Sequence, residues 1–504
     1  MADSEAQLPR RLESPRSSLP IVSRVALEIS NRERARLDSL AVRIAADEPA
    51  FAATDAFGPL VSSGQSSGPA LLIGDHSEIP LALPVEASVF EYRMLLLAND
   101  GDFLVLSGER YPRFEDYCRR VLRRGRASFL ELARANSHRH SALADRCAGQ
   151  AEIFSQIVTA ARDHGGITIM PDIGMDSSWN LAASIAKACG AQIRVCAPPP
   201  RLTRRVNDKL WFSERVADVL GSHSQPKIYY SFGPAALTAQ VATLAKRFRR
   251  VVVKVPDASG SAGNLSLDAA SVRNLTEHEL RRRLLSMLQS LGWQESFPLL
   301  VGVWECSAIS SPSVQIWIPQ RKDGLPVVEG IFEQFVEHEQ GEFVGARPAI
   351  LAAKIQSELA AEAGRLAYLF QQLGYFGRCS FDAILIDQEA GGVAVHWIEC
   401  NGRWGGVSVP MTLANGLQAG APKLPFTIVQ RTEIGRRPEH FGTVLSRLGN
   451  LAYRPDGDGC GVVLLSPGGI ETGTGSHFMA FAETVTAAQS LATKAASIMA
   501  SGGP

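Results

Sequence analysis

The ten residues "WIECNGRWGG", from Trp397 to Gly406, hold the densest set of side chains in the chain that could do chemistry. The acid Glu399, the amide Asn401 and the guanidinium Arg403 occupy alternate positions. In an extended strand, alternate residues point to the same face. The spacing therefore predicts that an acid, an amide and a cation project together from one face of an otherwise apolar strand.

The longer stretch "CSFDAILIDQEAGGVAVHWIECNGR" predicts a β-hairpin. Its two halves alternate in the manner of strands, and the glycine pair between them supplies the positive φ values that a hairpin turn needs. A turn centred between Ala390 and Gly391 would place Asp382 opposite Glu399. The same register would pair Ile386 with Val395, Ile384 with Trp397, Leu385 with His396 and Phe381 with Cys400.

Two opposed carboxylates need a reason to lie together. Directly opposed residues have Cβ atoms about 5 Å apart, so Asp382 and Glu399 would repel each other unless they shared a proton or bound a divalent cation. Asn401 adds a carbonyl oxygen, and an all-oxygen ligand set favours Mg²⁺ or Mn²⁺. Arg403 could then neutralise phosphate oxygens. The structural alternative is that Asp382 lies at a fraying strand end while Glu399 and Arg403 form a salt bridge.

Two lysines precede this hairpin in the chain. Lys209 lies in "VNDKLWFSERVADVLG", which predicts a helix capped by Asn207. A cation in the first turn of a helix is disfavoured unless an anion lies nearby, and the alternative is a solvated lysine. Lys254 ends a β-branched strand and is followed by a small-residue loop from Ala258 to Asn264. Such a loop offers unobstructed amides to a polyphosphate, although it could also be an ordinary turn. It lacks the P-loop pattern.

A third segment, "LLVGVWECSAISSPSVQIWIP", places an irregular connection between two apolar strands. Irregular backbone after a buried strand has amide and carbonyl groups that could bind the edge of an adenine ring. The alternative is a connecting loop. Single histidines, at His338, His396 and His477, have no neighbouring nucleophile or ligand spacing, so we interpret them as structural or surface residues.

The elements that position these residues fall into four predicted parts. Residues 1–60 form a polar tail and an amphipathic helix, and residues 61–200 alternate strands and helices, which predicts an α/β domain with a largely parallel sheet. Its predicted strands include "ALLIG", "MLLLAN", "DFLVLSG", "GITIMP" and "AQIRVCA". Residues 201–425 hold the candidate chemistry. Residues 426–504 predict a small α+β domain with two strands around a Gly-rich turn, "PGGIETGTG", and an Ala-rich helix.

The composition excludes several classes of protein. The 504 residues include 51 Lys plus Arg and 51 Asp plus Glu, so no net charge points to a nucleic-acid or membrane partner. The 8 cysteines lack the close spacing of a zinc site or disulfide framework, which favours a reducing, cytoplasmic location. We find no signal peptide and no apolar run long enough to span a bilayer.

Taken in chain order, these motifs resemble the ATP-grasp superfamily over roughly residues 165–425. The resemblance rests on Lys209, Lys254 before the small-residue loop, Glu305 after a strand, Asp382, and the Glu-x-Asn-x-Arg signature. It implies a multidomain α/β and α+β fold with a pre-ATP-grasp α/β domain, a two-lobed ATP-grasp core and a small C-terminal α+β domain. The layout, including "GVVLLSPGGIETG", is similar to that of the pheganomycin-type peptide ligases.

The resemblance also implies a role for each candidate residue. ATP would lie between two subdomains, and Mg²⁺, or alternatively Mn²⁺, would be bound by Asp382, Glu399 and Asn401. Arg403 and Lys254 would be catalytic. The remaining nucleotide contacts would come from the lysines, the loop that acts as a lid, the adenine pocket and the next strand: Lys209, Lys254, Ser259, Gly260, Ser261, Gly263, Glu305, Cys306, Ala308 and Gln315. The loop has only two glycines between Ser259 and Asn264, where many relatives have three or more.

The activity that the resemblance implies is an ATP-dependent carboxylate–amine ligase. An acyl phosphate would form, ADP and phosphate would be released, and an amino acid or peptide would be joined in specialised metabolism. Its expected partners are ATP, a carboxylate substrate and an amine substrate, and a homodimer stays open. Two alternatives remain, an ATP-grasp phosphotransferase that makes no amide and a nucleotide-binding module without turnover.

Overall fold

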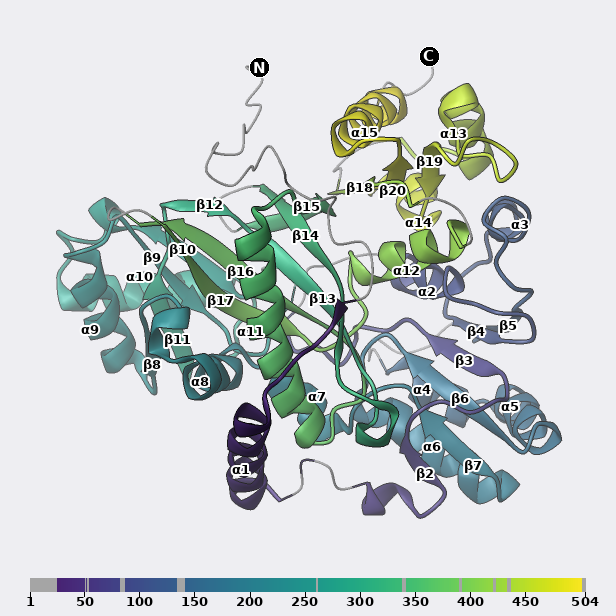
Figure 1. Ribbon diagram of the computed structural model, residues 1–504, viewed down its shortest axis with the longest axis horizontal. Coiled ribbons are helices and arrows are strands. Elements are labelled where there is room, and N and C mark those ends of the chain that lie inside the picture. Colours follow the sequence, from purple (N-terminus) through teal and green to yellow (C-terminus); the bar gives the residue numbers. More distant parts are fainter. Residues whose placement is uncertain are drawn as a thin grey trace.

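Three β-sheets organise the part of the chain that the computed structural model describes, as Figure 1 shows. One is a parallel sheet near the N-terminus, and the other two are antiparallel and carry the predicted site. The predicted combination of α/β and α+β parts is confirmed. None of the described helices is both long enough and apolar enough to cross a bilayer. The described residues are 25–49, 51, 54–81, 87–133, 141–259, 262–337, 341–388, 392–419, 423–432 and 437–500.

The N-terminal sheet has six strands in the order β2-β7-β6-β3-β4-β5, and every neighbouring pair is parallel. Its middle strands, β3 and β6, are mostly apolar because helices cover both faces. This confirms the predicted largely parallel sheet. Its strands are Val61–Ser63 (β2), Ala70–Ile73 (β3), Phe103–Leu106 (β4), Ser128–Glu131 (β5), Gly166–Pro171 (β6) and Gln192–Val195 (β7). Its helices are Ala87–Leu95 (α2), Pro112–Arg120 (α3), Leu143–Gly149 (α4), Ala151–Asp163 (α5) and Asp176–Cys189 (α6).

The predicted strand "MLLLAN" is wrong. Residues Met94 and Leu95 end helix α2, and the chain then turns toward β4. A short apolar run that is buried on all sides has no period that distinguishes a helix from a strand. This helix carries Phe90 and Arg93 to the wall of the central cleft.

The second sheet is a four-stranded antiparallel sheet in the order β10-β9-β11-β8. Helices α9 and α10 pack against one face and bury an apolar cluster. Helix α10 begins with a complete capping box between Thr276 and Glu279. The elements are Ile228–Ser231 (β8), Pro234–Ala245 (α9), Arg250–Lys254 (β9), Asn264–Asp268 (β10), Glu277–Ser290 (α10) and Leu299–Val303 (β11).

The third sheet has ten strands, in the order β12-β16-β13-β14-β15-β18-β20-β19 with β17 paired to β16 and β1 to β14. Helices α1, α8 and α11 pack on its core, and Ser30 caps α1. The strands are Val25–Ala26 (β1), Ala308–Ser310 (β12), Pro312–Ile318 (β13), Val327–Glu337 (β14), Glu342–Pro348 (β15), Gly377–Asp387 (β16), Val393–Asn401 (β17), Phe426–Thr432 (β18), Gly461–Leu464 (β19) and Gly475–Phe481 (β20). The helices are Asn31–Asp47 (α1), Pro200–Asn207 (α7), Lys209–Leu220 (α8), Ala353–Gln372 (α11) and Ser408–Leu417 (α12).

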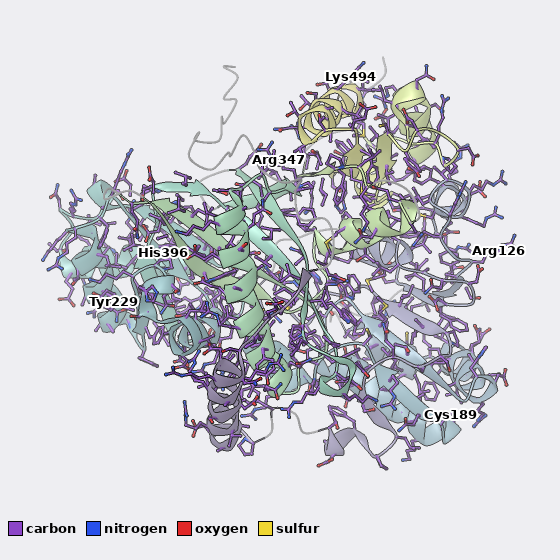
Figure 2. The ribbon with its side chains drawn as sticks, in the orientation of Figure 1. Arg126, Cys189, Tyr229, Arg347, His396 and Lys494 are labelled. Carbon is purple, nitrogen blue, oxygen red and sulfur yellow. The ribbon has the colours of Figure 1, made fainter. Side chains whose placement is uncertain are left out.

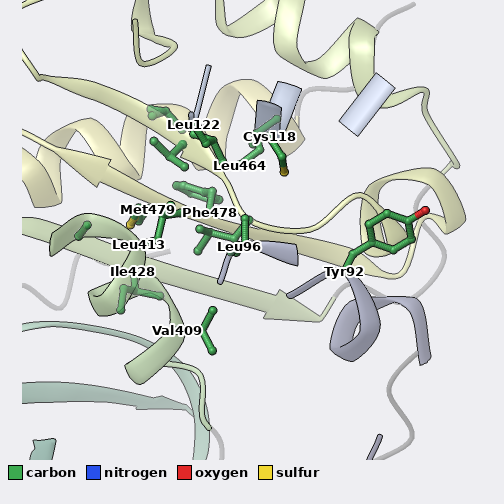
Figure 3. Packing of buried hydrophobic residues seen from close by; sticks show 14 of the residues in the cluster. Tyr92, Leu96, Cys118, Leu122, Val409, Leu413, Ile428, Leu464, Phe478 and Met479 are labelled. Atoms are coloured by element: carbon green, nitrogen blue, oxygen red, sulfur yellow. The ribbon is translucent and has the colours of Figure 1, made fainter. Parts of the chain in front are cut away.

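The C-terminal segment is joined to this sheet through strand β18, which pairs with β15 on one side and β20 on the other. It also shares an apolar cluster with the N-terminal domain, where Leu96 and Cys118 pack with Leu464 and Phe478 (Figure 3). The predicted Gly-rich turn "PGGIETGTG" contains a short helix, Gly468–Thr472 (α14). The other helices are Phe441–Leu448 (α13) and Val485–Ala500 (α15).

Candidate functional site

A cleft of about 2100 Å³ separates the four-stranded sheet from the ten-stranded sheet. Strand β9 contributes Val252 and Lys254 to one wall, and strands β16 and β17 contribute Asp382 and Glu399 to the other. Part of the rim belongs to the N-terminal domain, through helix α2. The cleft reaches from the four-stranded sheet to Arg347 and Lys494, which Figure 2 labels near helix α15.

The predicted hairpin is present, and its central pairing is confirmed because Asp382 lies opposite Glu399 and Phe381 opposite Cys400. On the turn side of this pair, the predicted register is wrong by one residue. Trp397 pairs with Ala383, while the remaining pairs are Ile384–His396, Leu385–Val395 and Ile386–Ala394. A β-bulge between Asp382 and Ala383 causes the shift, since Ile398 is an extra residue in β17. Counting back from a symmetric turn cannot detect such a bulge, and residues 389–391 at the turn lie outside the described residues.

Asp382 is buried at the floor of the cleft and is held by two hydrogen bonds. Ser313 Oγ donates to Oδ1 at 2.6 Å, and Asn401 Nδ2 donates to Oδ2 at 2.9 Å. Burial and, after it, the nearby charge of Glu399 raise the pKa of Asp382 to about 7, against the hydrogen bonds from Ser313 and Gln334, which lower it. The carboxyl group therefore lacks a full counter-charge among the described residues.

Glu399 has a different environment although it faces the same cleft. Lys209 Nζ lies 3.4 Å from its Oε2. Burial alone would raise the pKa of Glu399, but the charges of Lys209, Lys254 and Arg403 outweigh that effect and lower it. The pair thus combines one firmly ionised carboxylate with one that readily holds a proton or a cation.

Lys209 is the first residue of helix α8, and its cap is Asp208 rather than the predicted Asn207. Asn207 instead ends helix α7, so the predicted single helix is preceded by a second short one. The alternative of a solvated lysine is wrong, because Lys209 is only 5% exposed and its Nζ donates to the carbonyl oxygen of Ala258 at 2.7 Å. The expected anion beside this first turn is Glu399.

Lys254 ends strand β9, opposite Asn264 on one side and Leu300 on the other, and points into the cleft. Burial lowers its pKa, while Glu399 raises it and the neighbouring Lys209 lowers it again. Two lysines therefore converge on the carboxylate pair from different elements. Their mutual repulsion would be relieved by an added polyanion such as a chain of phosphates.

The small-residue loop after Lys254 is folded against the N-terminal domain. Ser259 donates its backbone N–H to the carbonyl oxygen of Leu81 at 2.9 Å. A Cβ added at Gly263 would lie 2.5 Å from Cβ of Ala258, so the two arms of the loop pack too closely for a side chain there. The predicted lid residues Gly260 and Ser261 lie outside the described residues.

The predicted adenine-contacting residues line the same cleft. Glu305 and Cys306 lie between β11 and β12, and Ala308 begins β12. Nδ1 of His396 is 3.4 Å from Oε1 of Glu305. Gln315 is buried and donates to Ser313 Oγ at 2.9 Å. Gln315 thus supports the serine that holds Asp382, besides lining the cleft.

The structure reveals positioning residues that the sequence did not single out. Asn207 Oδ1 accepts hydrogen bonds from Gly402 N at 3.0 Å and from Arg403 Nη1 at 2.8 Å. In place of the Glu399–Arg403 salt bridge of the structural alternative, Arg403 makes an amide contact across two elements. Ser313 was detectable only as a polar residue two positions before Gln315 in an apolar strand.

The residues present fit a hard divalent cation. Asp382 and Glu399 offer opposed carboxylates, and Asn401 adds an amide whose nitrogen is turned toward Asp382. A cluster of three His, Cys, Asp or Glu side chains is absent from the described residues, so the donor set is two carboxylates and an amide. Such a set suits Mg²⁺ when phosphate oxygens and water complete the coordination.

Comparisons with known proteins agree with this architecture. Residues 91–191 match the family model described as "Pre ATP-grasp domain". The fold is similar to that of an N5-carboxyaminoimidazole ribonucleotide synthetase solved with ADP, with a TM-score of 0.51 and 12% identity over 86% of this chain and 97% of that chain. Residues 91–191 therefore resemble a pre-ATP-grasp domain, and the fold as a whole is similar to that of this synthetase. No curated protein matches the sequence.

Two further solved structures are similar at lower TM-scores. The synthetase of the same name from Thermus thermophilus has a TM-score of 0.49 and 13% identity, over 85% of this chain and 98% of that chain. A biotin carboxylase from Campylobacter jejuni, solved as a β-γ-ATP complex, has a TM-score of 0.48 and 15% identity, over 84% of this chain and 90% of that chain.

Proposed function

We propose that this protein is an ATP-dependent carboxylate–amine ligase that uses Mg²⁺ and forms an acyl phosphate. The observation that carries the proposal is the convergence of Lys209, Lys254 and Arg403 on the Asp382–Glu399 pair at the floor of one cleft. Three cations around two carboxylates hold more positive charge than the pair balances. MgATP supplies the polyphosphate and the cation that such a site lacks.

The chain's own residues bind and orient the reactants. Lys209 and Lys254 neutralise the phosphates, and the apolar wall around Val252 and Ile384 accepts the adenine ring. Asp382, Glu399 and Asn401 bind Mg²⁺, which neutralises the charge of the phosphate oxygens when it is bound. Arg403 stabilises the charge that develops on the transferred phosphoryl group.

Two balanced steps give the product. A carboxylate oxygen of the acid attacks the γ-phosphorus and its bond to the bridging oxygen breaks, so ADP leaves and an acyl phosphate remains. The amine nitrogen then attacks the acyl carbon, the carbon–oxygen bond to phosphate breaks, and the nitrogen releases a proton. The protein forms no covalent bond in either step; it holds the reactants in place and excludes water.

The finer proposal is that the acid and amine are amino acids or peptides. The size of the cleft supports this, since about 2100 Å³ exceeds the 300–1,000 Å³ typical of a small-molecule pocket. The similarity of layout to the pheganomycin-type peptide ligases supports it as well. A role in specialised metabolism and a cytoplasmic location belong to the same proposal.

The test is turnover with defined substrate pools. Purified protein is incubated with MgATP, pooled amino acids and short peptides, with each pool omitted in turn, while ADP, AMP and phosphate are quantified. The proposal expects ADP and phosphate only when an acid and an amine are both present, with a product one water lighter than their sum. Release of AMP would contradict it, and ADP release that needs no amine would favour a phosphotransferase.

Matched variants connect the turnover to the site. Glu399→Gln keeps the shape of the side chain and removes the charge that faces Lys209. We expect loss of turnover by at least about 100-fold, whereas Glu358→Gln on the exposed face of helix α11 should match the wild type. Tight MgATP binding by a wild-type protein that never turns over would instead support a binding module.

A further inference from the structure

The rim that the N-terminal domain contributes to the cleft holds a buried guanidinium that the mechanism above does not use. Arg93, in the last turn of helix α2, is 4% exposed and lines the cleft. Its Nε and Nη2 donate no hydrogen bond to any of the described residues. A buried cation usually keeps its donors paired, because an unpaired charge away from water is costly.

The neighbouring acid does not satisfy Arg93. Nη2 of Arg93 is 3.9 Å from Oδ2 of Asp172, which is too far for a hydrogen bond. The same oxygen is already paired with Nε2 of His76 at 2.9 Å. The other oxygen of Asp172 accepts the backbone N–H of Asp75 at 3.1 Å. The carboxylate of Asp172 is thus shared between His76 and Arg93, and the guanidinium of Arg93 keeps N–H donors for a further anion.

Phe90 packs against both His76 and Arg93. The ring of His76 lies 3.9 Å from the ring of Phe90, and Cζ of Arg93 lies 5.1 Å from the same ring. The backbone of Phe90 approaches strand β3 so closely that a Cβ at Gly74 would lie 2.2 Å from the Phe90 carbonyl oxygen. The side chains of His76, Phe90 and Arg93 therefore pack together at the wall of the cleft, and packed side chains favour specific binding.

Arg403 lies on the adjacent wall of the same cleft. The backbone N–H of Trp404 donates to the carbonyl oxygen of Asp172 at 2.8 Å, which joins the loop after β17 to the N-terminal domain. Burial lowers the pKa of Arg93, Asp172 raises it, and the charge of Arg403 lowers it again. Two guanidinium groups that repel each other across a cleft form a site for a shared anion.

We propose that Arg93, with His76 and Phe90, is the subsite that binds the carboxylate of the acid substrate beside Arg403. The planar guanidinium donates parallel N–H groups to the two carboxylate oxygens, a geometry that lysine cannot reproduce. This inference rests on the proposed function. It adds that the N-terminal domain selects the acid, while the two antiparallel sheets bind the nucleotide.

The test separates binding of the acid from its turnover. Acetate, benzoate, phenylacetate and N-acetylglycine are each titrated against the full-length protein with MgADP, and the shift in thermal midpoint is followed. The same acids are titrated with MgATP and hydroxylamine, which traps an acyl phosphate as a hydroxamate while ADP is measured. We expect Arg93→Met to raise the half-saturating acid concentration at least tenfold and to leave the MgATP dissociation constant within twofold.

Three further variants serve as controls for the effect of Arg93→Met. Arg126→Met removes an exposed arginine of the same domain, which Figure 2 labels far from the cleft, and should change neither constant. Because Arg93→Met leaves Asp172 buried and uncompensated, the double variant Arg93→Met with Asp172→Asn removes both charges together. Arg93→Lys should restore less than half of the lost affinity, because it returns the charge without the paired donors.

The outcomes distinguish the carboxylate subsite from the ligase proposal. ADP formation with an unchanged half-saturating acid concentration in Arg93→Met overturns the carboxylate subsite and leaves the ligase proposal standing. A midpoint shift that depends on Arg93, without ADP formation from any acid, overturns the ligase proposal and supports the subsite. A wild-type protein that shows neither response overturns both.

Discussion

Asn207 Oδ1 accepts a hydrogen bond from Arg403 Nη1 at 2.8 Å, and this contact joins the end of helix α7 to the loop that follows strand β17. The same oxygen accepts the backbone N–H of Gly402 at 3.0 Å. Asn207 Nδ2 donates to the carbonyl oxygen of Thr203 at 2.7 Å, so the amide itself cannot rotate freely. A residue 196 positions upstream therefore orients the guanidinium of Arg403, for which we propose a catalytic role.

Asn207→Ala should lower kcat by about 10- to 100-fold, because a misplaced guanidinium no longer meets the developing charge. The dissociation constant for MgATP should change by less than about threefold, since the lysines still bind the phosphates. Steady-state kinetics and nucleotide titration measure the two constants. Asn180→Ala, at an exposed position of helix α6, is the control. An equal loss in both constants would show that Asn207 holds the site together as a whole.

The contact between Asn207 and Arg403 also requires a glycine at position 402. A Cβ added there would lie 2.4 Å from Cγ2 of Val206 and 3.0 Å from Nδ2 of Asn207. Gly402→Ala should therefore destabilise the protein by about 1–3 kcal/mol and displace Arg403. Thermal unfolding and kcat report the two effects. Gly149→Ala, where a Cβ meets nothing within 4 Å, should leave both unchanged.

Lys254→Met should weaken MgATP binding by about 10- to 100-fold, which corresponds to the loss of charge-assisted hydrogen bonds to phosphate. The side chain lies near Glu399 in the cleft, so the variant also leaves that carboxylate with less positive charge around it. Nucleotide titration in the presence of Mg²⁺ measures the change. Lys246→Met, at the exposed end of helix α9, is the matched control. Unchanged binding in Lys254→Met would exclude a phosphate contact for this lysine.

His477 gives the folded protein a sensitivity to acid. Burial and, after it, the charge of Arg93 lower the pKa of His477 to about 3. The unfolded chain binds a proton near pH 6.5 and the folded chain does not, so folding stability falls as the pH falls below about 6.5. At pH 5 the loss is about 2 kcal/mol. Between pH 7.5 and pH 5, His477→Phe should lose less of its thermal midpoint than the wild type does, by about 2 °C.

The matched control for this titration is His278→Phe, at an exposed position of helix α10. Its midpoint should follow the wild type at both pH values. A fall in midpoint that is the same for His477→Phe and the wild type would show that His477 does not resist protonation in the folded state.

The sequence predicted the site to the extent that its members are close in the chain. The pairing of Asp382 with Glu399 followed from alternation and a glycine turn, and it is present. The same count missed the bulge at Ile398, because an extra residue leaves no mark in the hydrophobic pattern when both neighbours are apolar. Helix α8 was predicted, but its cap was assigned one residue early, since Asn207 and Asp208 are both good caps.

Contacts between distant elements left no signal in the sequence. Asn207 and Arg403 meet only because helix α7 ends beneath the loop after β17. Phe90 and Arg93 reach the cleft on helix α2, whose last two residues, Met94 and Leu95, were predicted to begin a strand. Local pattern thus predicted which residues share a strand face, while tertiary packing decided which elements meet across the cleft.

The join between the C-terminal segment and the rest of the protein predicts the behaviour of a truncated chain. Strand β18 pairs with β15 over Ala346–Ile428 and Gly345–Val429, so a chain that ends at residue 425 would leave the edge of β15 unpaired. The same truncation would expose apolar residues of helices α2 and α3 that pack against Phe478. We expect residues 1–425 to lose cooperative thermal unfolding and MgATP binding together. The full-length Phe478→Ala variant, which removes a single buried ring, should unfold cooperatively with a stability lower by about 3–5 kcal/mol. A truncated chain that unfolds cooperatively and binds MgATP would show instead that the two antiparallel sheets are stable without the apolar cluster that the C-terminal segment shares with the N-terminal domain.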